Sequence, residues 1–281
     1  MDSSSRKLII VAVTAILLTA GVMTVFGGSS SGASESEITI TGSTTLQPIM
    51  VDFKEQYEKE TVGVTLTITG GGSGGGIVAA GQGTHDIGMT SRDVRASELA
   101  SYPDMQVHVI GKDGVAIIVG SSVATAGITD LTRAQVEGIY NGTYTNWNQL
   151  GGPDQTITKY TRDTASGTRD CFDSTVMKNS DISLDTLVTA SNSQMKTDVN
   201  NNPWSIGYVG LAFIDGTNPL DIGGVSPTAA NVANGDYEIQ RNLILVTGSE
   251  PSEWTAAFME WIMQPTAQQI LANKGFVPLA A

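Results

Sequence analysis

A run of six glycines and one serine at residues 70–76 constrains the fold most, because it lies between a strand pattern and a helix pattern. Residues 64–69 alternate apolar and hydroxyl side chains, as a half-buried strand does, and residues 77–80 are apolar like a turn of helix. Gly/Ser runs usually are flexible linkers. A linker joins independent segments, however, whereas this run lies inside one strand–helix unit. We therefore expect an anion-binding loop with bare N–H groups at the start of a helix.

Composition excludes several classes of protein. The chain has 281 residues, enough for two modest domains or one large one, and a formal net charge of −13, which argues against nucleic acid as a partner. Cys171 is the only cysteine, so there is no disulfide, cysteine metal cluster or redox pair. The two histidines, His85 and His108, lie too far apart in the sequence to indicate a metal-binding pair. We expect no metal and no cofactor.

The N-terminus indicates the compartment. Arg6 and Lys7 precede residues 8–26, a run without charge that is long enough to span a membrane. The basic residues before the run place the N-terminus in the cytoplasm and the rest of the chain on the other side of the membrane. We expect an uncleaved membrane anchor followed by a Gly/Ser tether up to Ser36, and hence an extracytoplasmic protein at the cell surface. Cleavage among the small residues 31–34 is the alternative, whereas a lipid-modified cysteine is excluded because none follows the apolar run.

Strand and helix patterns alternate along the rest of the chain, which predicts an α/β fold. Pro48 fits the first turn of a helix, and Gly275 fits a left-handed helix end. The predicted strands are residues 38–41, 64–69, 86–89, 106–110, 115–119, 156–160, 206–209 and 243–246, and the predicted helices are residues 49–57, 77–80, 95–102, 131–140, 172–176, 254–262 and a last one ending at residue 274.

Four loops after predicted strands are rich in hydrogen-bond donors. Ligands bind at the carboxyl ends of strands in open α/β sheets, and hydroxyls, bare N–H groups and guanidinium suit an oxyanion. The hydroxyls after the first strand are more numerous than a helix cap needs, although capping is the alternative. The candidate ligand-binding residues are Ser43, Thr44, Thr45, Gly72, Ser73, Ser91, Arg92, Arg162, Ser166, Gly167 and Thr168.

Three nucleotide or catalytic motifs fit less well. The glycine run satisfies G-x-G-x-x-G, as any glycine run does, but it does not lie in the first strand–helix turn of the chain. It also satisfies G-x-S-x-G around Ser73, yet both histidines fall by residue 108 and leave no late triad histidine. No G-x-x-x-x-G-K-[ST] sequence is present, which excludes a nucleotide-hydrolysing P-loop.

With these loops in view, the chain resembles the PstS family, the phosphate-binding proteins of ABC transporters. The resemblance rests on residues 42–48, 70–76, 86–92 and 162–169, with further similarity at residues 139–147, 206–209 and 275–279. It implies a two-lobed periplasmic-binding-protein-like fold of type II, with two crossover strands as the hinge, at residues 115–119 and 241–247. Lobe I would be residues 37–117 and 243–281, lobe II residues 118–242, and the anchor with its tether residues 1–36.

The resemblance also implies what the candidate residues do. Thr44, Thr45, Ser73, the Ser91 region, Arg162 and residues 166–168 would hold inorganic phosphate, and a monomer would deliver it to the permease subunits of an importer without chemistry on it. Binding of another oxyanion such as sulfate or molybdate, a phosphatase-like enzyme, and a sensor or adhesin are the alternatives.

The chain departs from the family pattern at two positions. Ser91 stands where some members carry an aspartate that accepts the phosphate proton, so Asp163, Asp93 or a hydroxyl would have to accept that proton here. Ala165 stands where glycine is usual, and its Cβ requires a negative φ.

Overall fold

The computed structural model describes residues 36–178 and 180–279. These residues belong to one compact unit, Ser34–Ala281. The predicted anchor at residues 8–26 lies outside the described residues, and no helix in the described part is long and apolar enough to cross a membrane. Ser36, predicted as the end of the tether, is the first residue of strand β1.

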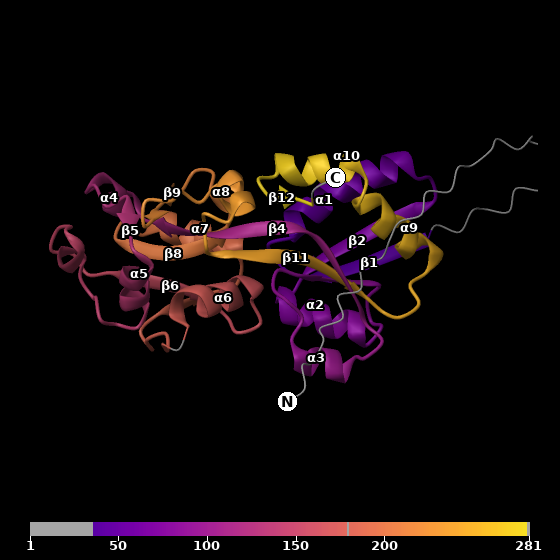
Figure 1. The fold of residues 1–281 in the computed structure, drawn as a ribbon, viewed down its shortest axis with the longest axis horizontal. Helices are drawn as coiled ribbons and strands as arrows, with labels where there is room; N and C mark the ends of the chain where they lie inside the picture. The colour runs from indigo at the N-terminus through magenta and orange to yellow at the C-terminus, as the bar shows by residue number, and fades with distance from the viewer. Residues whose placement is uncertain (1–35, 179, 280–281) are drawn as a thin grey trace, which may run out of the picture. The chain divides into compact units, whose positions relative to one another are not determined.

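The chain forms the expected alternation of strands and helices (Figure 1). The elements are β1 (Ser36–Gly42), α1 (Gln47–Glu60), β2 (Val64–Gly70), α2 (Gly72–Gly81), β3 (Ile87–Thr90), α3 (Ala96–Ser101), β4 (Gln106–Val119), α4 (Ser121–Thr125), β5 (Asp130–Leu131), α5 (Arg133–Tyr140), η1 (Trp147–Leu150), β6 (Thr158–Arg162), α6 (Gly167–Phe172), η2 (Asp173–Met177), β7 (Leu187–Thr189), α7 (Asn192–Asn201), β8 (Ser205–Gly210), η3 (Leu211–Phe213), β9 (Asn218–Pro219), β10 (Asp221–Ile222), α8 (Ala229–Asn234), β11 (Gln240–Thr247), α9 (Glu253–Ile262), α10 (Pro265–Asn273) and β12 (Val277–Pro278).

One large sheet runs through the described residues in the order β2-β1-β3-β11-β4-β8-β6-β7. Strands β1, β2 and β3 are parallel to one another, and so are β6, β7 and β8. The long strand β4 connects the two groups, because its first part pairs with β11 and its second part, from Val115 to Val119, pairs with β8. Figure 1 shows β4 and β11 passing between the two groups of elements.

Each group of strands has its own large apolar core. The first core contains Ile38, Phe53 and Phe258 and lies between β1–β3 and the helices α1, α9 and α10. The second contains Trp147, Phe172 and other buried side chains of α5, α6 and β8. Two buried cores joined by two shared strands are what a two-lobed protein requires.

The glycine run is mostly helix rather than loop, which corrects the prediction. Helix α2 begins at Gly72, so four of the glycines form its first turns. The reason is close packing: a Cβ added to Gly76 would lie 2.6 Å from the carbonyl oxygen of Met89 and 2.9 Å from the Cα of Gly42. Only glycine lets the helix approach strands β1 and β3 this closely.

Other boundaries also differ from the predictions. The two strands predicted at residues 106–110 and 115–119 are one strand, β4, because buried Asp113 pairs with Arg241 of β11 instead of forming a turn. Strand β6 ends at Arg162, so this arginine is the last strand residue rather than part of a loop. Thr132 does cap helix α5, and Gly275 has the expected positive φ of 86°. Helix α1 has no side-chain cap, so the hydroxyls before it serve another purpose.

Candidate functional site

Three serines meet where β1, β3 and helix α2 come together. The Ser43 hydroxyl donates to Ser91 Oγ at 2.9 Å, and Ser73 Oγ lies 3.3 Å from the same oxygen. The backbone N–H of Ser91 donates to Ser73 Oγ at 3.0 Å. All three side chains are buried. Because parallel strands end at the same edge of a sheet, residues far apart in the sequence form one cluster of hydroxyls here.

The second group of strands contributes the residues around the start of helix α6. Thr168 Oγ1 lies 3.2 Å from Thr45 Oγ1, and the N–H of Gly74 donates to the carbonyl oxygen of Ala165 at 3.1 Å. Gly167 is packed against the serine cluster, since a Cβ there would lie 2.3 Å from Ser73 Oγ. The segment from Ala165 to Thr168 therefore closes against the cluster formed by the first group of strands.

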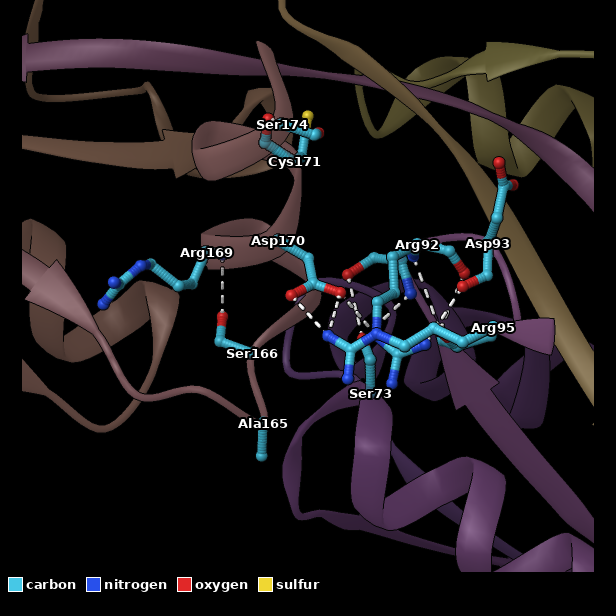
Figure 2. A network of polar contacts seen from close by, with 12 residues as sticks. Ser73, Arg92, Asp93, Arg95, Ala165, Ser166, Arg169, Asp170, Cys171 and Ser174 are labelled. Atoms are coloured by element: carbon cyan, nitrogen blue, oxygen red, sulfur yellow. Dashed lines mark hydrogen bonds and ion pairs between the residues drawn. The ribbon is translucent and has the colours of Figure 1, made fainter. Parts of the chain in front are cut away.

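Ser166 is buried as well, but its side chain has a local task. Its hydroxyl oxygen accepts the N–H of Arg169 at 3.2 Å and so caps helix α6. Figure 2 shows this contact beside Ala165 and opposite Ser73. The backbone of Ser166 is engaged as well, since its N–H donates to the carbonyl oxygen of Asp163 at 3.2 Å and its carbonyl oxygen accepts the N–H of Asp170 at 3.0 Å.

Arg162 brings an unpaired positive charge to the same place. Its side chain is 1% exposed, and its Nε and Nη2 donate to the carbonyl oxygens of Thr189 and Ala190, both at 3.2 Å. Nη2 also lies 3.5 Å from Thr44 Oγ1. Nη1 is buried and has no hydrogen-bond partner among the described residues, and no carboxylate there forms an ion pair with this guanidinium. Burial accordingly lowers the pKa of Arg162 below its usual value.

A buried charge of this kind is costly unless an opposite charge or further hydrogen bonds compensate it. The neighbours of Arg162 are carbonyl and hydroxyl oxygens, which satisfy part of its donors but none of its charge. The arrangement of a free guanidinium nitrogen beside a cluster of hydroxyls is suited to an anion with several oxygens.

Sequence reasoning missed two residues of this site. Asn192, at the start of helix α7, donates to Thr45 Oγ1 at 2.9 Å and to Thr44 Oγ1 at 3.3 Å. Arg241 donates through Nη2 to Thr45 Oγ1 at 3.0 Å and forms a buried ion pair with Asp113 at 2.6 Å. Asn192 comes shortly after the three-residue strand β7, which the sequence pattern did not predict, so the strand-end argument had no strand from which to locate it.

Arg92 is the predicted ligand residue that the structure does not bring into the cluster. Its guanidinium binds Glu98 at 2.8 and 2.6 Å. It also binds Asp170 at 3.0 Å (Figure 2). Two carboxylates therefore match its charge. Gly72, also predicted, has a φ of 79° and lies close to the backbone of Ala165 at the edge of the cluster.

The carboxylates suggested as proton acceptors have other partners. Asp163 accepts the N–H of Ala165 at 2.8 Å, and Asp93 accepts the side-chain amide of Asn242 at 3.0 Å. The oxygens that line the cluster are those of hydroxyl groups, which both donate and accept. No cluster of potential metal ligands occurs in the described part of the chain.

Comparison with known proteins places this geometry in a family. A family model described as a PBP superfamily domain matches residues 27–266. The chain is 33% identical to an ABC-type phosphate transport receptor from Vibrio cholerae, with a TM-score of 0.71, covering 87% of this chain and 100% of that one. The chain belongs to the PBP superfamily, as a member of the PstS family. This membership confirms the predicted α/β fold of the type II periplasmic-binding-protein class.

Other PstS relatives agree with this assignment. The phosphate-binding protein PstS of Bacillus subtilis is 27% identical over 245 residues, which cover 86% of this chain and 80% of that protein. A protein from Clostridium perfringens, whose crystal structure contains bound phosphate, is 29% identical with a TM-score of 0.83, covering 87% of this chain and all of that one. Members of the family are substrate-binding proteins.

Proposed function

We propose that this protein captures inorganic phosphate between two lobes and delivers it to an ABC importer. The observation that carries the proposal is the buried Arg162, whose Nη1 has no partner among the described residues and whose Nη2 lies 3.5 Å from the hydroxyl oxygen of Thr44. The relatives support the choice of ligand, since they are phosphate-binding proteins or, in one case, a phosphate transport receptor.

In this proposal Arg162 supplies the charge, and hydroxyls and backbone N–H groups supply the remaining hydrogen bonds. The guanidinium and the segment 166–168 belong to lobe II, residues 118–242, whereas Ser43, Thr44, Thr45, Ser73 and Ser91 belong to lobe I, residues 37–117 and 243–281. The contacts between the two sets support this division, because each joins a residue of the first group of strands and helices to a residue of the second group. Asn192 and Arg241 hold Thr45 in place.

We further propose that the body lies outside the cytoplasm, anchored by residues 8–26, and that it acts as a monomer with permease subunits as its partners. The uncharged run after Arg6 and Lys7 supports the anchor. The mass of the protein purified from membranes tests this: an uncleaved anchor gives the full 29.4 kDa, and a cleaved one gives a smaller mass.

The protein performs no chemistry on phosphate in this account. A phosphatase needs an activated nucleophile or metal ions, and the serine hydroxyls here bond to one another rather than to a general base. Release of phosphate from phosphate esters at a rate above the uncatalysed one would refute this part of the proposal.

Isothermal titration calorimetry with phosphate, sulfate, arsenate and molybdate tests the ligand. We expect one phosphate per chain and weaker binding of sulfate, which lacks a proton to share with a hydroxyl acceptor. Tight binding of sulfate or molybdate without heat from phosphate would show that the site serves a different oxyanion.

A further inference from the structure

A large cavity lined mostly by polar side chains adjoins the cluster of hydroxyls, and Arg241 belongs both to its lining and to the candidate site. Its volume is about 610 Å³, and its lining residues come from the segment after β3, from α6 and η2 with the residue that follows, and from the two shared strands β4 and β11. A cavity of this size is far larger than one oxyanion, since a single water occupies about 30 Å³ of liquid. We call it the vestibule.

Two lysines give the vestibule positive charge that no described carboxylate matches. Five basic side chains and three carboxylates line the cavity, and each of the three arginines among them forms an ion pair, with Glu98, Asp170 or Asp113. The basic residues are Arg92, Arg95, Lys112, Lys178 and Arg241. Lys112 and Lys178 are exposed and form no ion pair with any described acidic residue. The two lysines therefore present free charge to whatever enters the cavity.

The vestibule adjoins the phosphate cluster through Arg241. One nitrogen of this guanidinium, Nη2, donates to Thr45 Oγ1 at 3.0 Å, and the residue also lines the vestibule. Its Nη1 is buried without a partner among the described residues, in a side chain that is 3% exposed. A buried donor without a partner, next to a cavity, indicates that a ligand in the cavity supplies the hydrogen-bond acceptor.

Two ion pairs between residues of the two lobes lie in the wall of the vestibule. Asp170 of helix α6 binds Arg92 at 3.0 Å and Arg95 at 2.6 Å, and both arginines follow strand β3 (Figure 2). Arg92 directly follows Ser91 of the cluster, and Asp170 lies two residues after Thr168. Parting of these contacts would join the cavity to the cluster, because they connect the two lobes.

We propose that the vestibule is an outer anion site that attracts hydrated oxyanion dianions and passes them to the cluster. The proposal rests on the proposed function. Its physical reason is that an acidic protein repels a dianion, so that capture requires a local region of positive potential at the entrance. Clefts lined by charge of one sign raise association rates by about 10- to 1,000-fold, so the two free lysines in a lining of mixed charge should act at or below the low end of that range. The vestibule accordingly sets the rate of association, and the cluster sets the rate of release.

Rapid filtration with radiolabelled phosphate, followed by a chase, measures both rates. Lys112→Glu and Lys178→Glu should each lower the association rate about three- to tenfold at low salt and leave the release rate within about twofold. Lys59→Glu makes the same change in net charge at the far end of helix α1, about 20 Å along the helix from its start, and should have little effect. At about 1 M salt, where screening acts over about 3 Å, the variants should converge.

Two results would refute the proposed role of the vestibule and leave the proposed function intact. One is an unchanged association rate in both lysine variants, and the other is an equal decrease of the association rate in Lys59→Glu. Lys112→Gln and Lys178→Gln, which remove a charge without adding one, serve if a reversed charge impairs folding, and should show a smaller decrease in the same rate. Failure of the unaltered protein to bind phosphate at all would overturn both proposals.

Discussion

Replacement of Arg162 by methionine tests whether the charge of this side chain serves phosphate binding or the stability of the fold. Methionine keeps much of the length of the side chain but removes the guanidinium and its charge. In the structure this guanidinium donates to two backbone carbonyls and has no acidic partner among the described residues. If a bound phosphate is its counter-charge, the substitution should damage binding far more than folding.

The magnitude follows from the contacts. Truncation of one member of a buried charge pair costs about 2–5 kcal/mol. At about 1.4 kcal/mol for each factor of ten, this means a loss of about 30-fold to several thousandfold in phosphate affinity. For folding, two opposing effects arise: removal of an unpaired buried charge stabilises the protein, whereas the two carbonyls lose a donor at about 1–3 kcal/mol each. We expect the unfolding free energy to change by no more than about 2 kcal/mol.

Arg241→Met provides the matched control, because Arg241 is also a buried arginine but has a carboxylate partner. Its loss leaves Asp113 buried without its cation and should destabilise the protein by about 3–5 kcal/mol. Calorimetry with phosphate and urea denaturation without phosphate measure the two effects. The reasoning is refuted if Arg162→Met loses less than tenfold in affinity, or if it destabilises the ligand-free protein as much as Arg241→Met does.

Three further changes test other parts of the account. Gly167→Ala places a methyl group 2.3 Å from Ser73 Oγ and should lower phosphate affinity at least tenfold, whereas Gly75→Ala, with open space around its Cβ, should bind normally in the same calorimetric titration. Asp170→Asn removes the ion pairs with Arg92 and Arg95, worth about 1 kcal/mol, and should speed phosphate release about fivefold in the chase experiment; unchanged release would show that these ion pairs do not hold the lobes together. Burial lowers the pKa of His108 in the folded protein. The resulting stabilisation is complete above about pH 6.5, the pKa in the unfolded chain, and is lost as pH falls through the lower folded pKa. In urea denaturation, His108→Gln should reduce the change of unfolding free energy with pH over this range, and an unreduced change would contradict the reasoning.

The alternation of strands and helices was predictable because apolar periodicity is a local property. The strand before the glycine run and the helix after it lie at the expected places. The start of the helix was not predictable, since glycine disfavours helices locally. The need for glycine at Gly76 arises from the backbone of Gly42 and Met89, which the fold brings against it.

In the candidate site, too, local sequence signals predicted some features and tertiary contacts determined the others. Strand ends predicted the serine cluster and Arg162, because parallel strands gather their carboxyl ends at one edge. The contact between Arg241 and Thr45 joins residues far apart in the sequence and has no local signal. Likewise, the sequence beside Arg92 does not show that Asp170 takes up its charge. Pairing of charges depends on tertiary structure, which is why one predicted arginine lies in the site and the other lies outside it.

A crystal structure of the protein with phosphate tests the central claim most directly. We predict a phosphate between the serine cluster and residues 166–168, with one oxygen about 2.7–2.9 Å from Nη1 of Arg162. A phosphate bound only in the vestibule, or at a site that leaves this nitrogen without an acceptor, would contradict the account.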